Sequence, residues 1–251
     1  MKKCYLHIGN FKTGSSSLQA FLYQNRKIFR KHSIEPVYEK NFFKKTINNL
    51  KLFKNFNDQD QNKLREKFKK YKKFKNIIIS SEYFSCMSND EYKIIFLKKF
   101  LKKSGFKPII IFYYRDDDDY LYSFYSEQLK QRKNIEIENV FKFLEKIYKF
   151  GYYFNKKNKI YYLSQKYFFD KKIIFKTWKK IFKSDFKYYK YYKEDDKRIY
   201  FNFLSFVNIK GKEKFNFPIK RNISRKIRPW NLMRIGLYLF LKFHSKKLLN
   251  R

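Results

Sequence analysis

The segment from Gly9 to Ser17 holds residue types that together could bind a phosphate group. It reads Gly-Asn-Phe-Lys-Thr-Gly-Ser-Ser-Ser, follows a short apolar run at residues 4–8, and opens a stretch with helical periodicity. Backbone N–H groups at a helix N-terminus carry partial positive charge, and glycines let that backbone approach an anion closely. Lys12 adds a full positive charge. The segment therefore predicts an anion cradle between a strand and a helix.

A second candidate anion site follows the apolar run at residues 109–114. Arg115 ends this run, and Ser123 lies two helical turns further on. A guanidinium suits bidentate contact with phosphate, and ligands of α/β proteins bind at the carboxyl ends of parallel strands. Two anion sites, each placed after its own strand, predict a ligand with two separated phosphate groups.

The order of residues in the first loop departs from the nucleotide-binding pattern GxxxxGK[ST], because Lys12 precedes the second glycine. Taken alone, the loop is also compatible with a plain strand-to-helix turn capped by a serine. An ATP-dependent small-molecule kinase of the P-loop type remains an alternative, although its usual motif is absent from this loop.

The elements that must position these residues alternate between strand and helix. Strands are expected at residues 4–8, 77–80 and 109–114, and helices at 15–30, 89–103 and 116–130. Such alternation is typical of an α/β fold, a parallel β-sheet flanked by helices. The C-terminal half is expected to be rich in helices, at 137–150, 160–183, 196–207 and 230–247, with one strand at 186–192. Without a repeat or a linker, residues 1–251 are expected to form a single domain.

Both motifs resemble those of sulfotransferases that use 3′-phosphoadenosine 5′-phosphosulfate (PAPS). The stretch from His7 to Gln19 is similar to the 5′-phosphosulfate loop of that family, and the stretch from Tyr114 to Gln128 to its 3′-phosphate segment. Weaker likenesses to bacterial members are Ser80-Ser81-Glu82, Trp178-x-x-Ile181-Phe182 and Asn222-Ile223-Ser224. The resemblance covers residue 4 to about 235 and implies a P-loop-NTPase-like sulfotransferase fold over one sulfotransferase domain. The four-aspartate run that begins at Asp116 departs from the family pattern.

The resemblance also implies roles for individual residues. Lys12 would contact the bridging oxygen of the phosphosulfate and stabilise the leaving phosphate. The 5′-phosphate would be held by Thr13, Gly14, Ser15, Ser16 and Ser17. Arg115 and Ser123 would hold the 3′-phosphate. The implied acceptor is a hydroxyl or amine of a carbohydrate or glycolipid, and PAPS would be the co-substrate.

The acceptor needs a general base, and two glutamates are candidates. Glu82 follows the strand expected at 77–80, whereas Glu39 begins a Glu-Lys-Asn-Phe-Phe stretch that resembles one in glycosaminoglycan sulfotransferases. We favour Glu82 because it should lie at the same sheet edge as the loop and Arg115. No metal is expected, because four consecutive aspartates at a helix start cannot all face one ion.

The formal net charge of +39 has two interpretations. A basic chain can bind nucleic acid, and a basic nucleic-acid-binding protein is therefore a further alternative. However, Lys, Asn, Ile, Phe and Tyr dominate throughout and alanine occurs once, which indicates a base-composition bias. We therefore expect no specific nucleic acid partner. A cytoplasmic protein is expected because the sequence has no signal-peptide h-region and no apolar stretch of about 18 residues that could span a bilayer. The basic C-terminal helix expected at 230–247 is compatible with peripheral contact with the inner face of an anionic membrane, but we favour a core helix with a basic exposed edge.

Overall fold

The computed structural model describes residues 1–10, 13–37, 65–66, 68–116, 119–120, 123, 153–155, 160–162, 171–192, 195, 197–210 and 213–218. The chain divides into two compact units. The first unit comprises Met1–Arg115 and Asp170–Arg221, and the second comprises Asp116–Phe169 and Asn222–Arg251. The first unit holds the sheet and most of the residues that the structure describes.

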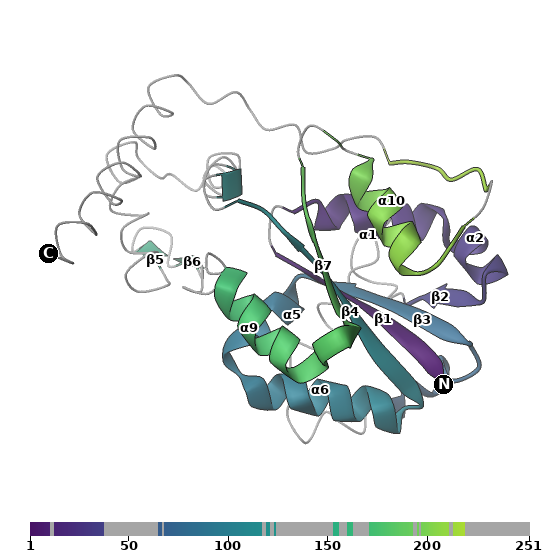
Figure 1. The fold of residues 1–251 in the computed structure, drawn as a ribbon, viewed down its shortest axis with the longest axis horizontal. Coiled ribbons are helices and arrows are strands. Elements are labelled where there is room, and N and C mark those ends of the chain that lie inside the picture. The colour runs from purple at the N-terminus through teal and green to yellow at the C-terminus, as the bar shows by residue number, and fades with distance from the viewer. Residues whose placement is uncertain are drawn as a thin grey trace, which may run out of the picture. The chain divides into compact units, whose positions relative to one another are not determined.

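A five-stranded parallel sheet forms the centre of the first unit, in the order β2-β3-β1-β4-β7 (Figure 1). Its strands are β1 (Lys2–Gly9), β2 (Ile34–Pro36), β3 (Asn76–Ser81), β4 (Phe106–Tyr114) and β7 (Phe186–Lys190). The sequence correctly predicted an α/β fold with a parallel sheet flanked by helices. Central β1 is buried from Cys4 to Gly9, as expected for a strand covered on both faces.

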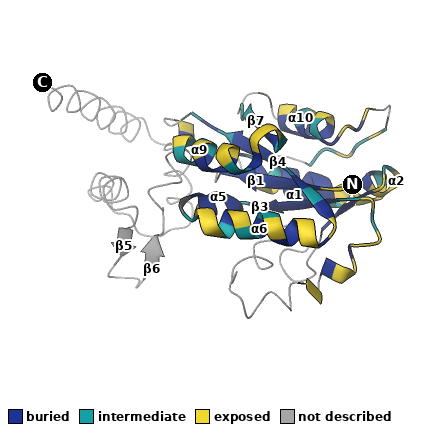
Figure 2. Cartoon of the chain, turned by 60° about the horizontal axis from the view of Figure 1, so that its bottom comes forward, coloured by how far each residue is buried: buried dark blue, intermediate teal, exposed yellow. Residues whose placement is uncertain are grey.

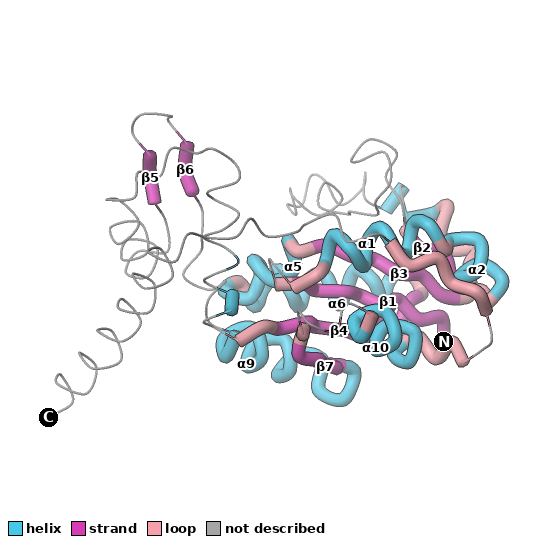
Figure 3. Tube along the Cα trace, turned by 90° about the horizontal axis from the view of Figure 1, so that it is seen from above, coloured by secondary structure: helices cyan, strands magenta, loops and turns pink. Residues whose placement is uncertain are grey.

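Helices cover both faces of this sheet, as the burial colours and the view from above show (Figures 2 and 3). The helices are α1 (Ser15–Gln24), α2 (Arg26–Lys31), α5 (Tyr83–Cys86), α6 (Glu91–Lys103), α9 (Lys171–Phe182) and α10 (Arg198–Phe206), with 3-10 turns η1 (Met87–Asn89) and η2 (Lys183–Asp185). Alternate residues of β1 point to opposite faces. Leu6 packs in the core with α6 and α9, whereas Tyr5 packs in the core with α1 and α10.

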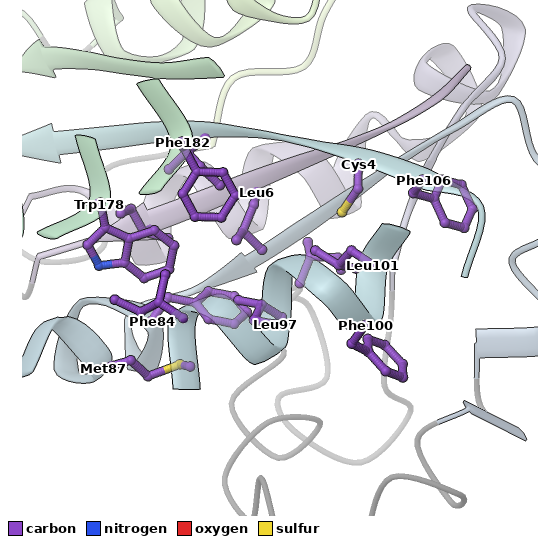
Figure 4. Close-up of a cluster of buried hydrophobic side chains, with 14 of the residues drawn as sticks. Cys4, Leu6, Phe84, Met87, Leu97, Phe100, Leu101, Phe106, Trp178 and Phe182 are labelled. Atoms are coloured by element: carbon purple, nitrogen blue, oxygen red, sulfur yellow. The ribbon is translucent and has the colours of Figure 1, made fainter. Parts of the chain in front are cut away.

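The core on the α6 and α9 side is closed by aromatic residues (Figure 4). Trp178 of α9 is fully buried and stacks on Phe182, with ring centroids 5.5 Å apart. Its indole N–H donates to the hydroxyl of Ser88 at 3.0 Å, which satisfies the polar atom of this large side chain. The contact fixes α9 against η1, just beyond the end of β3.

The helix expected at 15–30 is divided in two at Asn25. The Asn25 amide donates to the carbonyls of Phe21 and Asn216, both at 2.8 Å, and its oxygen accepts from the Asn216 N–H at 2.8 Å. A side chain that competes for backbone groups in this way ends one helix and starts another. The partner, Asn216, is remote in the sequence, so periodicity alone could not reveal the break.

Edge strand β2 lies in a segment for which the sequence predicted no strand, and its Glu35 pairs with Arg30 at 2.5 Å. Within the helix expected at 160–183, Lys171–Phe182 is helix α9, whereas Ile160–Tyr162 is strand β6, antiparallel to β5 (Tyr153–Asn155) in the second unit. Among the helices that the structure describes, none has the length and apolar character needed to cross a membrane. The segment 230–247 lies outside the described residues.

Candidate functional site

The carboxyl ends of three neighbouring strands, β3, β1 and β4, bring the described candidate site residues of the first unit to one edge. In the register of the sheet, Ile8 pairs with Ser81 and Gly9 pairs with Tyr113. Adjacent strands lie about 4.8 Å apart, so the chain segments that leave β3 and β4 flank the loop after β1. This edge is where parallel α/β proteins bind their ligands.

Both glycines of the loop are required by the space around them. A Cβ on Gly9 would lie 2.1 Å from Ser15 Oγ and 3.1 Å from a ring carbon of His7. Gly14 has a φ of +77°, and its Cβ would lie 2.7 Å from the Tyr191 ring. A side chain at either position would therefore push the loop away from the strand and from the residues that follow β7.

The hydroxyls of the loop divide into an inward pair and an outward pair. Thr13 Oγ1 donates to the Asn10 carbonyl at 2.6 Å, and Ser15 Oγ reaches the same carbonyl at 3.5 Å. Ser16 is exposed and Ser17 is partly buried. Gly14, the residue before α1, has no side chain with which to cap the helix. The N-terminus of α1 can therefore present N–H groups, and the hydroxyls of Ser16 and Ser17, to an anion.

Arg115 follows β4 and is only 7% exposed. Its guanidinium carbon lies 5.5 Å from the ring centroid of Tyr191, within the range of a cation–π contact. Tyr191 follows β7, and its N–H donates to the Tyr114 carbonyl at 2.7 Å. The same ring contacts Gly14, so one aromatic side chain joins the loop to Arg115. Sequence reasoning missed Tyr191, because one tyrosine in a chain with 23 gives no signal of such a contact.

Glu82 directly follows β3 and precedes the short helix α5, which packs against β1. The Glu82 carbonyl accepts the Ser85 hydroxyl at 2.7 Å and the Ser85 N–H at 3.2 Å, which fixes its backbone in a tight turn. The Glu82 side chain is partly buried. Glu82 therefore lies just after the strand that pairs with β1, at the edge of the sheet where the loop begins.

His7 lies beneath the loop and is completely buried. Its Nδ1 lies 2.7 Å from Ser80 Oγ, and its ring packs edge-on against Tyr113 with centroids 5.6 Å apart. Burial lowers the pKa of His7 from 6.5 to about 3, so the imidazole is neutral at physiological pH.

Several expected site residues are not placed relative to this edge. Lys12 and Glu39 lie outside the described residues. Ser123 is helical but belongs to the second unit, and so does Asp116, whose carbonyl accepts the Tyr120 N–H at 2.8 Å as in a first helical turn. In the part of the chain that the structure describes, no cluster of three His, Cys, Asp or Glu residues could hold a metal ion.

The fold has a counterpart among solved structures. A sulfotransferase from Alicyclobacillus acidocaldarius superposes with a TM-score of 0.54 over 100% of this chain and 97% of its own, at 10% sequence identity. No protein-family model and no curated protein matches the sequence. The likeness extends over the whole chain, and at this identity it establishes the shared fold.

Proposed function

We propose that this protein is a sulfotransferase that moves a sulfuryl group from PAPS to a hydroxyl or amine of a carbohydrate or glycolipid acceptor. The observation that carries the proposal is the double contact of Tyr191, which touches Gly14 in the loop and Arg115 after β4. The loop at Gly14 and the guanidinium of Arg115, both suited to binding anions, thereby lie beside the Tyr191 ring at the carboxyl edge of the sheet. The shared fold with a solved sulfotransferase supports the same conclusion.

The residues at this edge fit a ligand with two phosphate groups. The N-terminus of α1, with Ser16 and Ser17, offers N–H and O–H donors for the 5′-phosphate. Arg115 offers a guanidinium for the 3′-phosphate, and Ser123 is proposed to join it. PAPS supplies the sulfuryl group, and cleavage of its S–O bond to the 5′-phosphate leaves adenosine 3′,5′-bisphosphate. Lys12 is proposed to stabilise the charge that develops on that leaving phosphate.

Acceptor activation is assigned to Glu82, with Glu39 as the alternative. A carboxylate beside the loop can take the proton of an acceptor hydroxyl or amine while the acceptor atom attacks sulfur in line with the leaving oxygen. The acceptor class, carbohydrate or glycolipid, rests on the sequence resemblance alone. A role in the cytoplasm, with contact to an anionic membrane through residues 230–247, is part of the same proposal.

Calorimetry tests the cofactor. Adenosine 3′,5′-bisphosphate should bind more tightly than AMP, which lacks the 3′-phosphate, and R115A should abolish that preference. R26A is the matched control, because Arg26 also lies over a tyrosine ring, Tyr23 at 4.8 Å, but on a helix surface. Tighter binding of ATP with Mg²⁺ would instead favour a kinase. Nanomolar, sequence-selective binding of nucleic acid at physiological salt would favour the nucleic-acid alternative.

A further inference from the structure

A groove lined by basic side chains lies between helix α6 and the segment that leads into β3. Its volume is about 410 Å³, within the usual range of ligand sites. Phe68 fixes the segment to the helix, because its fully buried ring packs edge-on against Phe100 of α6 with centroids 5.1 Å apart. The groove is therefore built on the hydrophobic core. Its lining cations are Arg65, Lys69 and Lys72 on one side and Lys99 and Lys103 of α6 on the other.

The lining of the groove is strongly positive. Among the described residues that form it, five cations stand against one carboxylate, that of Glu66, which pairs with Lys69 at 2.7 Å. Lys99 and Lys103 are both exposed and lie one helical turn apart, and like charges at this spacing repel each other and destabilise a helix. An anion bound between the two walls would relieve this repulsion, so the groove favours an anionic occupant.

The floor of the groove is aromatic. Phe100 is almost completely buried and Phe96 is partly buried, and both line the groove. Tyr92 lies one turn before Phe96 on the same face of α6 and is 71% exposed, so the aromatic row extends beyond the groove. Aromatic rings beside cations suit an acidic sugar, because the C–H face of a pyranose packs on a ring while the carboxylate or sulfate groups of the sugar meet the cations.

One end of the groove, at Lys72 and Lys103, lies at the amino ends of the strands. Helix α6 ends at Lys103, shortly before β4 begins at Phe106, and Phe106 pairs with Lys2 at the start of β1. The Lys2 ammonium also donates to the carbonyl of Lys72. The eight residues of β1 separate this end of the sheet from the anion-binding loop by about 25 Å. The groove is therefore distinct from the candidate site at the carboxyl edge.

We propose that this groove is a second anion site and that it binds a linear acidic polysaccharide, a chain with carboxylate or sulfate groups at regular intervals. Charge complementarity and the aromatic floor determine the occupant. A phospholipid bilayer presents a flat surface, whereas these cations line a concave site. A single-stranded nucleic acid binds to rings that lie open to its bases, whereas the rings that line this groove are partly or almost completely buried.

The inference goes beyond the proposed function, because binding in the groove uses none of the residues at the carboxyl edge. One consequence does rest on the proposed function. A long acceptor held in the groove would present its other units to the loop at a raised local concentration. Loss of the groove should then raise KM for long acceptors and leave kcat unchanged. If the protein transfers no sulfuryl group, the proposed function fails, and the binding experiments below still decide the role of the groove.

Calorimetric titration with an oligogalacturonate, a linear chain of uronic acids, tests the binding. We expect K99E/K103E to bind it about tenfold more weakly than wild type at physiological salt. K27E/K31E is the matched control and should bind within about twofold of wild type, because Lys27 and Lys31 are also exposed and one turn apart, on helix α2. Equal losses in both double variants would mean that the chain binds to scattered lysines and would overturn the proposal. Absence of binding by wild type would overturn it as well.

Two milder variants keep the fold intact and separate the aromatic row from the charge. K99Q/K103Q removes the repulsion between the two lysines, so it should weaken binding about fivefold without lowering the melting temperature. Y92S should weaken binding about threefold, whereas F201S, at an exposed ring of α10, should leave it unchanged. Unchanged affinity in K99Q/K103Q would overturn the proposal even if K99E/K103E fails to fold.

Two other anionic probes check the identity of the occupant. An oligothymidylate and vesicles that contain phosphatidylserine should bind wild type more weakly than the oligogalacturonate does. Their binding should change no more in K99E/K103E than in K27E/K31E, because the lysines of the whole chain contribute to it. Tighter binding of either probe that is lost in K99E/K103E alone would assign the groove to nucleic acid or to a membrane, and would overturn the proposal.

Discussion

The guanidinium of Arg115 lies 5.5 Å from the ring centroid of Tyr191, and both residues follow the carboxyl ends of paired strands. Cation–π contacts contribute about 0.5–2 kcal/mol, with the larger values where the cation is shielded from water. Arg115 is mostly buried, so its contact belongs to the stronger end of that range. The same ring also lies beside Gly14, where an added Cβ would come within 2.7 Å of it, so Arg115 and the loop share one aromatic neighbour.

We therefore expect Y191L to weaken binding of adenosine 3′,5′-bisphosphate about tenfold, while Y191F leaves it within about twofold. The phenyl ring keeps both the flat surface beneath Arg115 and the contact with Gly14, whereas the branched aliphatic side chain keeps neither. Calorimetric titration measures the effect. Y23L is the control, because it breaks the Arg26–Tyr23 pair and should leave affinity unchanged. Equal weakening by Y191L and Y191F would show that the ring does not orient Arg115.

Gly14 and Gly105 form a matched pair for testing the loop. Both have positive φ, 77° and 90°, but a Cβ on Gly14 would meet Tyr191 and Ile199 whereas a Cβ on Gly105 would meet open space. We expect G105A to cost about 1–2 kcal/mol from backbone strain alone and G14A to cost about 1–3 kcal/mol more. Urea unfolding gives both values. Equal losses would mean that the loop shifts freely away from Tyr191.

The strand–loop–helix unit and the parallel sheet were predictable because they depend on local pattern. The apolar run before Gly9, the glycines around the turn and the periodicity after Ser15 all agree with one another, and the same holds for the run before Arg115. Where several local signals agree in this way, the secondary structure of a segment can be predicted from its sequence.

The features that were missed depend on contacts between distant residues. Asn25 breaks a helix through Asn216, and Tyr191 joins Gly14 to Arg115. Strand β2 is three residues long and contains a proline, so only its pairing with β3 defines it. Ile160–Tyr162 lies in an aromatic-rich stretch where helix and strand patterns are equally satisfied. Such elements are decided by tertiary pairing rather than by local preference.

The two candidate bases can be separated by isosteric substitution. We expect E82Q to lower kcat by about 10²–10⁴-fold while affinity for adenosine 3′,5′-bisphosphate stays near wild type, because a base acts on the acceptor and not on the nucleotide. E39Q is the parallel variant and should change kcat little. Radiolabelled sulfate transfer from PAPS to an accepted carbohydrate measures the rate. A large loss of kcat in E39Q with little change in E82Q would assign the role of general base to Glu39.

Lys12 should be more important for turnover than for binding. We expect K12A to weaken binding of the bisphosphate by about tenfold but to lower kcat by about 10²–10³-fold, because a charge aimed at the leaving phosphate has its main effect as the S–O bond breaks. K27A, in the exposed face of α2, is the control and should match wild type. Equal losses in binding and in kcat/KM, with kcat unchanged, would reduce Lys12 to a binding residue.

The burial of His7 predicts a specific dependence of stability on pH. Its pKa is 6.5 in the unfolded chain and about 3 in the folded protein, so between these values the unfolded state binds the additional proton. The free energy of unfolding should therefore fall as the pH is lowered through this window, by up to about 1.4 kcal/mol per pH unit from this residue alone. H7Q has no group that titrates there, so its stability should fall less steeply than that of wild type between about pH 6 and pH 4. Urea unfolding at several pH values gives both slopes, and the comparison of slopes removes any constant difference in stability between the variants. Parallel slopes would mean that His7 takes up its proton in the folded protein, and hence that its ring can reach water or an anionic partner.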